Sequence, residues 1–114
     1  MQAANDNRAQ DRRAIARHRV LMGGKVAWMD NFLSGDCTIR DLSDVGARVE
    51  LATEVLPRDP VLIVVRSGLA HEARTVWARG RVAGLEFVRT YDLDAAIPDR
   101  LARLRRLWID NLPR

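Results

Sequence analysis

Two short patterns of polar residues near the start of the chain have the chemistry of a nucleotide site. The first is a pair of arginines four positions apart, Arg13 and Arg17. A guanidinium is permanently charged and grips phosphate with a planar fork of N–H donors, so this pair suits a phosphate-rich ligand. The second pattern is Asp41-x-Ser43-x-x-Gly46. A carboxylate with a hydroxyl two positions on suits guanine, whose ring N–H and exocyclic amine need acceptors.

Composition indicates one small domain whose partner is anionic. The chain has 114 residues and a formal net charge of +4, and Lys25 is its only lysine, so arginine carries most of the positive charge. The single cysteine, Cys37, excludes an internal disulfide and fits a reducing compartment. Neither the apolar block of a signal peptide nor a run of about 20 apolar residues is present. We therefore expect a cytoplasmic protein without a membrane span.

The elements that would position these residues are short strands followed by one helix. Alternating or β-branched runs predict six strands, and the short turns between them imply antiparallel pairing. Gly23-Gly24 in the first run suggests a bulge or bend, and Ser34-Gly35 is typical of a turn. The expected strands cover residues 20–29, 37–40, 47–51, 61–65, 71–78 and 81–88.

The C-terminal region predicts an amphipathic helix over about 97–111. Ile97, Leu101, Leu104 and Trp108 recur at helical spacing, and Pro98 suits a first helical position. The opposite face is charged, with Arg103, Arg106 and Asp110. This helix would dock a partner if the barrel did not already cover its apolar face.

The order of these features resembles a PilZ domain. The arginine pair stands before the first strand, and Asp41-x-Ser43-x-x-Gly46 follows at the turn between the second and third strands. The segment Gly84-Leu85-Glu86-Phe87 is similar to the one that closes the family's barrel, so the resemblance covers about 12–88. Arg8 and Arg12 share the spacing of the arginine pair, but the family places its pair directly before the strand.

The resemblance implies a mainly β fold, a six-stranded antiparallel β-barrel with a C-terminal helix. The barrel would cover about 20–90, within one domain over 12–114. Residues 1–11 are polar and lack periodicity, so we expect them to form a disordered tail.

The resemblance also implies that the chain binds cyclic di-GMP, a bacterial second messenger. Arg13 and Arg17 would contact the phosphates and stack a guanidinium plane on guanine, Asp41 would accept from the guanine edge, and Ser43 would add a hydrogen bond. Gly46 would allow a positive φ or the close approach of a ligand. Each residue also has a purely local interpretation: a solvated basic arm for the arginines, and ordinary turn chemistry for the Asp, Ser and Gly.

Arg12 directly precedes the arginine pair. In the family an arginine at this position is associated with binding a stacked dimer of the ligand, so two ligands per domain are one expectation. A solvated charge with no contact is the other.

The remaining chemistry-bearing residues do not indicate catalysis. His18 and His71 have no companions at metal-ligand spacing, and one cysteine cannot make a zinc site. No phosphate loop, nucleophile elbow or paired carboxylates are present. We expect no enzyme activity, no metal and no cofactor apart from the ligand. Trp28, Trp77 and Trp108 are expected in the core or against the helix, not as a stacking surface.

The leading hypothesis is a receptor whose arginine arm becomes ordered on the barrel when the ligand binds, which changes the surface shown to a downstream effector protein. One alternative is a PilZ-like interaction module that does not bind the nucleotide. Another is a small barrel that binds nucleic acid. Charge favours this last interpretation, but the strands carry no cluster of outward aromatics, and Asp41 would repel a phosphate backbone.

Overall fold

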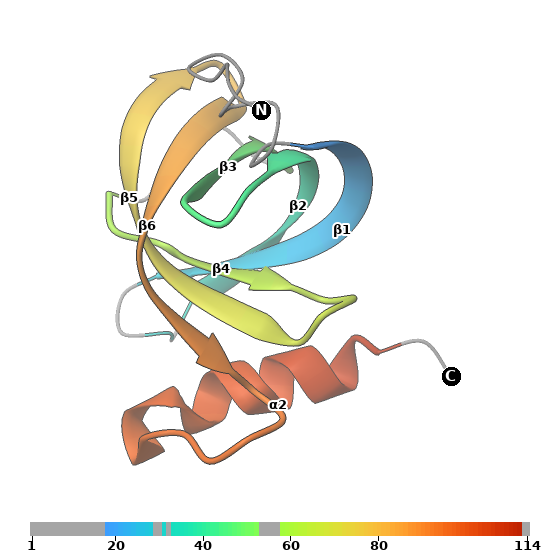
Figure 1. Cartoon of the computed structure of the whole chain (residues 1–114), viewed down its shortest axis with the longest axis vertical. Helices are drawn as coiled ribbons and strands as arrows, with labels where there is room; N and C mark the ends of the chain where they lie inside the picture. The colour runs from blue at the N-terminus through green and yellow to red at the C-terminus, as the bar shows by residue number, and fades with distance from the viewer. Residues whose placement is uncertain (1–17, 29–30, 32, 53–57, 113–114) are drawn as a thin grey trace, which may run out of the picture.

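The computed structural model describes residues 18–28, 31, 33–52 and 58–112. It contains six strands and a C-terminal helical segment that lies across one end of them (Figure 1). The segment comprises a short 3₁₀ helix, η1 (Asp99–Leu101), and α2 (Ala102–Asp110). The strands are β1 (His18–Trp28), β2 (Leu33–Leu42), β3 (Gly46–Leu51), β4 (Val61–Val64), β5 (Leu69–Arg79) and β6 (Val82–Asp92).

The strands close into an antiparallel barrel, which confirms the predicted fold. Their order around the barrel is β1-β2-β3-β6-β5-β4, and β1 pairs with β4 to close it. Alternate residues of the strands point inward and form the core, because a strand's side chains alternate between its faces. Ile39, Val49, Leu62, Ala83 and Leu85 are among these buried residues.

Strand β4 separates two apolar clusters, which explains its continuous β-branched sequence. Leu62 and Val64 belong to the core inside the barrel. Val61 and Ile63 belong to a second cluster, between the barrel and the helix. All four residues are therefore buried, as expected for a strand covered on both faces.

The C-terminal helix packs its apolar face on this second cluster. Leu101 and Leu104 are buried there, and Ile97 and Trp108 pack against them. The indole Nε1 of Trp108 donates to the carbonyl oxygen of Val65 at 2.9 Å. The barrel thus covers the predicted apolar face, so that face is not available to a partner. Among the described residues, no helix is long and apolar enough to cross a membrane.

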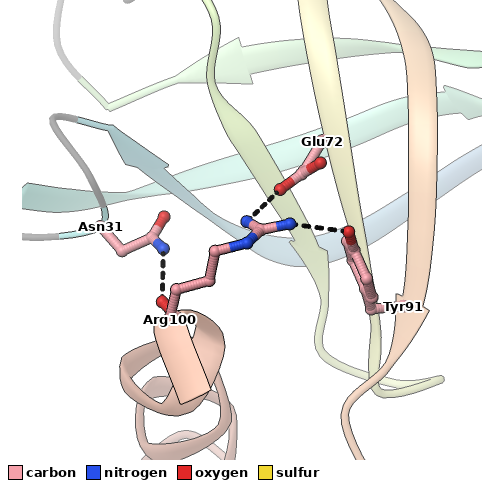
Figure 2. Close-up of polar contacts among 4 residues, drawn as sticks. All are labelled: Asn31, Glu72, Tyr91 and Arg100. Carbon is pink, nitrogen blue, oxygen red and sulfur yellow. Dashed lines mark hydrogen bonds and ion pairs between the residues drawn. The ribbon is translucent and has the colours of Figure 1, made fainter. Parts of the chain in front are cut away.

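Arg100, at the start of the helical segment, forms hydrogen bonds to two strands of the barrel, as Figure 2 shows. Its Nη1 donates to Oε2 of Glu72 on β5, and its Nη2 donates to the hydroxyl of Tyr91 on β6, each at 2.9 Å. Asn31 donates from Nδ2 to the backbone oxygen of Arg100 at 3.5 Å. The helix is therefore held by polar contacts at its beginning and by Trp108 further along.

Two local predictions were wrong, both where glycine was taken as a break in a strand. The irregularity in β1 lies between Arg19 and Met22, and the strand continues through Gly23 and Gly24. Ser34-Gly35 is not a turn but part of β2, paired with residues 26–27 of β1. In both places cross-strand hydrogen bonds outweigh the local preference of glycine for turns.

Candidate ligand-binding site

A row of paired residues crosses five neighbouring strands. Arg19 on β1 lies opposite Asp41 on β2, and Asp41 lies opposite Arg48 on β3. Arg48 lies opposite Gly84 on β6, which in turn lies opposite Trp77 on β5. Sheet pairing therefore brings together an acid, a base and an aromatic residue that are far apart in the sequence.

Two β-bulges place Asp41 and Trp77 of this row on the outer face of the barrel. The register shifts between Ile39 and Asp41 on β2, and again between Thr75 and Trp77 on β5. Ile39 is in the core, and strict alternation would send Asp41 there too. One extra residue reverses the alternation, so Asp41 shares a face with Arg48.

Gly84 forms the floor beneath Trp77. It lies between the core residues Ala83 and Leu85, so its own open side faces away from the core. The indole of Trp77 occupies that side, because a Cβ built on Gly84 would overlap the indole nitrogen Nε1. Gly84 is therefore the residue that lets Trp77 lie flat against β6.

The outer face is hollowed along this row into a groove of about 220 Å³. Asp41, Ser43 and Gly46 all line it, so the structure brings the whole second sequence pattern together. Arg48 and Trp77, which belong to neither pattern, line it as well. Pockets for whole ligands are typically about 300–1,000 Å³, so this groove suits one planar base more than a complete dinucleotide.

Asp41 is almost fully covered, and an arginine covers it. Its side chain is 6% exposed, and its Oδ2 accepts from Nε of Arg48 at 2.5 Å. The Arg48 side chain is 35% exposed. A ligand that reaches Asp41 from the groove therefore also meets the guanidinium of Arg48.

Ser43 uses its hydroxyl within the turn. The backbone N–H groups of Val45 and Gly46 donate to Oγ at 3.2 Å, and Oγ donates to the carbonyl oxygen of Gly46 at 3.3 Å. A hydroxyl has one donor and two acceptor positions, so these contacts occupy it fully. In the free protein Ser43 therefore forms hydrogen bonds within its own turn, and a direct hydrogen bond from Ser43 to guanine stays a prediction.

Gly46 is required by packing between strands. A Cβ at this position would overlap the backbone oxygen of Leu85 on the paired strand β6. Its φ is not positive, so that part of the expectation was wrong; the described glycines with positive φ are Gly68 and Gly80. Gly46 thus allows β3 to approach β6 at the edge of the groove.

The arginines of the first pattern, Arg12, Arg13 and Arg17, lie outside the described residues. The point where they join the barrel is nevertheless fixed. Strand β1 begins at His18, which pairs with Leu42, and Leu42 lines the groove. The first strand of the barrel therefore begins beside the groove.

Trp77 corrects the prediction for the tryptophans. Its side chain is 46% exposed and lines the groove, although we expected it in the core. Trp28 and Trp108 do pack on the two apolar clusters, as expected. The sequence did contain an indication that Trp77 lies on the surface. The predicted hairpin around Arg79-Gly80 brings Trp77 close to Gly84, and an aromatic residue that faces a glycine can lie flat on the surface of a sheet.

A larger hollow, of about 680 Å³, lies between β1 and the end of α2. Leu21, Met22 and Arg66 line it together with Lys25 and Asp36, which form an ion pair with each other. Asp41, Ser43 and Gly46 do not line it. We therefore place the candidate site at the smaller groove, which is lined by Asp41, Arg48 and Trp77.

His71 and Cys37 have structural roles. His71 is buried and stacks on Phe87 with ring centroids 3.9 Å apart, and its Nδ1 is 2.8 Å from Oγ1 of Thr90. Burial lowers the pKa of His71 to about 4. Burial also raises the pKa of the Cys37 thiol to about 12, so this thiol is a poor nucleophile. The described residues contain no group of three or more side chains able to hold a metal ion.

A family model described as PilZ domain matches residues 7–106. The chain belongs to the PilZ domain family. PilZ domains are non-enzymatic nucleotide-binding adaptor modules, and in general they bind cyclic di-GMP. The expectation that the chain is not an enzyme is thereby confirmed. The matched range includes the arginine segment as well as the barrel. No curated protein matches the chain.

Proposed function

We propose that this PilZ chain is a cytoplasmic receptor for cyclic di-GMP that acts on a downstream protein. One observation carries the proposal: a single outer groove gathers Asp41, Ser43 and Gly46 beside a cation and an exposed aromatic ring, at the place where the arginine segment joins the barrel. Guanine needs acceptors and a flat surface, and its attached phosphates need cations.

Each part of the ligand has a partner in this arrangement. Asp41 accepts from the N1–H and N2–H groups of guanine. The indole of Trp77, flat against Gly84, supplies an apolar face for the base. The groove holds one base, so the phosphates lie outside it, towards the start of β1, where Arg13 and Arg17 would bind them. Ser43 holds the turn that carries these groups, and a bond from Ser43 to guanine would replace one of its local contacts.

The signalling step is an ordering of the arginine arm. Arg12, Arg13 and Arg17 repel one another until the ligand phosphates neutralise them, and the arm then closes over the ligand. The closed arm presents a new surface to the effector. Arg12 adds a contact for a second, stacked ligand.

Titration calorimetry with cyclic di-GMP tests the receptor function. We expect binding by the wild type and its loss in Arg17→Ala and in Asp41→Ala, with circular dichroism showing that both variants are folded. A stoichiometry of two that falls to one in Arg12→Ala would support the stacked dimer. Absence of heat with the wild-type protein at tens of micromolar would refute the proposal.

The same titration distinguishes the receptor from the alternative, an interaction module that does not bind the nucleotide. The ion pair between Asp41 and Arg48 is the observation that favours it, because the carboxylate already has a partner. A wild type that gives no heat, yet captures the same effector with and without cyclic di-GMP, would establish this alternative. Against it, the apolar face of α2 is covered by the barrel.

A further inference from the structure

We propose that Arg48 is a second guanine-binding residue, which donates to O6 and N7 of the same base whose N1–H and N2–H are bound by Asp41. This inference rests on the proposed function and deepens it, because it names the groups that select guanine. Arg48 lies outside both sequence patterns and enters the site through the register of the sheet.

The geometry of Arg48 leaves donors available beside Asp41. Among the described residues, Asp41 is its single polar partner, through Nε at 2.5 Å. A guanidinium has five N–H donors in one plane, and this bond uses one of them. Its side chain is 35% exposed and lines the groove, so part of it is accessible to a ligand there, and its bond to Asp41 runs through Nε and not through the terminal nitrogens.

The pair also matches the pattern of groups on guanine. Around the perimeter of the base, the donors N2–H and N1–H on the Watson–Crick edge are followed by the acceptors O6 and N7 on the adjacent Hoogsteen edge. A carboxylate bonded to a guanidinium presents acceptors followed by donors, in the same order. Arginine bound to O6 and N7 is a recurrent way of recognising guanine in nucleic acids. Adenine has a donor amine in place of O6, which would face the donors of Arg48. It also has an acceptor in place of N1–H, which would face the carboxylate of Asp41.

A second ion pair between β2 and β3 allows a comparison with Asp41 and Arg48, because it differs from them in burial and does not line the groove. Arg40 on β2 and Glu50 on β3 also form an ion pair, with Nη2 and Oε1 2.5 Å apart. Their side chains are 43% and 40% exposed, and neither lines the groove. Asp41, at 6% exposed, meets its arginine inside the groove. Arg40 therefore serves as a matched control for Arg48.

The test is calorimetry with two ligands, cyclic di-GMP and its 7-deaza analogue, which lacks the N7 acceptor. The proteins are the wild type, Arg48→Lys and Arg40→Lys. Lysine keeps a cation near the carboxylate but loses the fork that binds two acceptors together. We expect Arg48→Lys to bind cyclic di-GMP roughly tenfold more weakly, and Arg40→Lys to bind as the wild type does. The 7-deaza change should weaken binding several-fold in the wild type and have no further effect in Arg48→Lys.

The outcomes separate this inference from the receptor function. If the wild type binds cyclic di-GMP but tolerates the 7-deaza change, or if that change has the same effect in Arg48→Lys, the role of Arg48 is overturned and the receptor function stands. If the wild type does not bind cyclic di-GMP, both fall. The wild-type comparison of the two ligands holds even if Arg48→Lys does not fold, and Arg48→Gln is then the second variant.

Discussion

Single residues on the outer face of the barrel determine what the groove can bind. Gly84 is the clearest case, because its missing side chain is what allows the indole of Trp77 to lie against β6. Trp77 itself is nearly half exposed in the free protein and lines the groove, so its ring is accessible to a ligand there.

Replacing either residue should weaken ligand binding without unfolding the barrel. Stacking of a base on an aromatic ring contributes about 1–3 kcal/mol, and Trp77→Ala should cost that amount. Gly84→Ala should weaken binding in the same direction, because the new methyl group displaces the indole. Calorimetry with cyclic di-GMP measures both.

Gly23→Ala is the matched control for Gly84→Ala. Gly23 is also a strand glycine, but a Cβ there meets nothing within 4 Å. The Gly23→Ala substitution should leave the affinity for cyclic di-GMP unchanged. Equal losses in the two glycine variants would show that the effect comes from the strand backbone and not from Trp77.

A second residue-scale prediction concerns His71 and acid. Its folded pKa of about 4 is below the ordinary value of 6.5, since burial disfavours the charged form. The stabilisation is therefore complete above pH 6.5 and is lost as the pH falls from 6.5 towards 4. Between pH 7.5 and pH 5 the free energy of unfolding should fall by about 2 kcal/mol through this group.

Urea denaturation at the two pH values checks the loss. His71→Gln keeps a side chain able to bond to Thr90 but does not titrate, so its stability should change less over this range. The difference between the two proteins isolates His71 from the carboxylates. Identical pH dependence in both would contradict the assignment.

At the scale of elements, the turn between β4 and β5 joins the barrel to the helix. Gly68 in this turn has a φ of +74°, and a Cβ there would lie 2.7 Å from Cζ2 of Trp108. The same tryptophan donates to the carbonyl oxygen of Val65, which directly follows β4. The turn conformation and the docking of α2 therefore depend on the same glycine.

Gly68→Ala should destabilise the protein more than Gly80→Ala. Gly80 in the β5–β6 hairpin also has a positive φ, of +61°, but a Cβ there meets nothing within 4 Å. Gly80→Ala should cost about 1–2 kcal/mol for the left-handed backbone alone. Gly68→Ala adds the contact with Trp108, so thermal or urea unfolding should show a larger loss. Equal losses would mean that the helix adjusts freely to the turn.

At the scale of the whole molecule, the groove and the helix lie towards opposite ends of β5 and β6. Trp77 and Gly84 are near the hairpin that joins these strands, whereas Leu69 and Asp92 at their other ends adjoin the turn and the helical segment. Figure 1 shows the two long strands extending away from α2. A ligand in the groove therefore binds a barrel whose far end is already closed.

Because the folded barrel forms the site, cyclic di-GMP should stabilise the whole protein. At a free ligand concentration of about 100 times Kd, the gain is about 2.7 kcal/mol. For a chain of this size that raises Tm by roughly 10 °C. A thermal-shift measurement checks this, with Asp41→Ala as the control that should show no shift. A shift of equal size in Asp41→Ala would place the ligand elsewhere.

The sequence by itself determined the strands, the helix and the turn that carries Asp41 and Ser43. Alternating runs and a β-branched run over 61–65 indicated antiparallel strands and a helix whose apolar face must be covered, and the resemblance to PilZ domains implied that the strands close into a barrel. These signals are local or periodic, so they can be recognised without knowing which strands pair. The second motif was placed correctly for the same reason, since it coincides with a tight turn.

Only the tertiary structure decided which other residues join that motif. Arg48 and Trp77 reach the groove through strand register and two bulges, and a shift of one residue would turn either side chain to the other face. Trp77 was predicted to be in the core because its apolar character says nothing about register. The pairing of Asp41 with Arg48 was likewise hidden, since it depends on an extra residue in β2 that no local preference reveals.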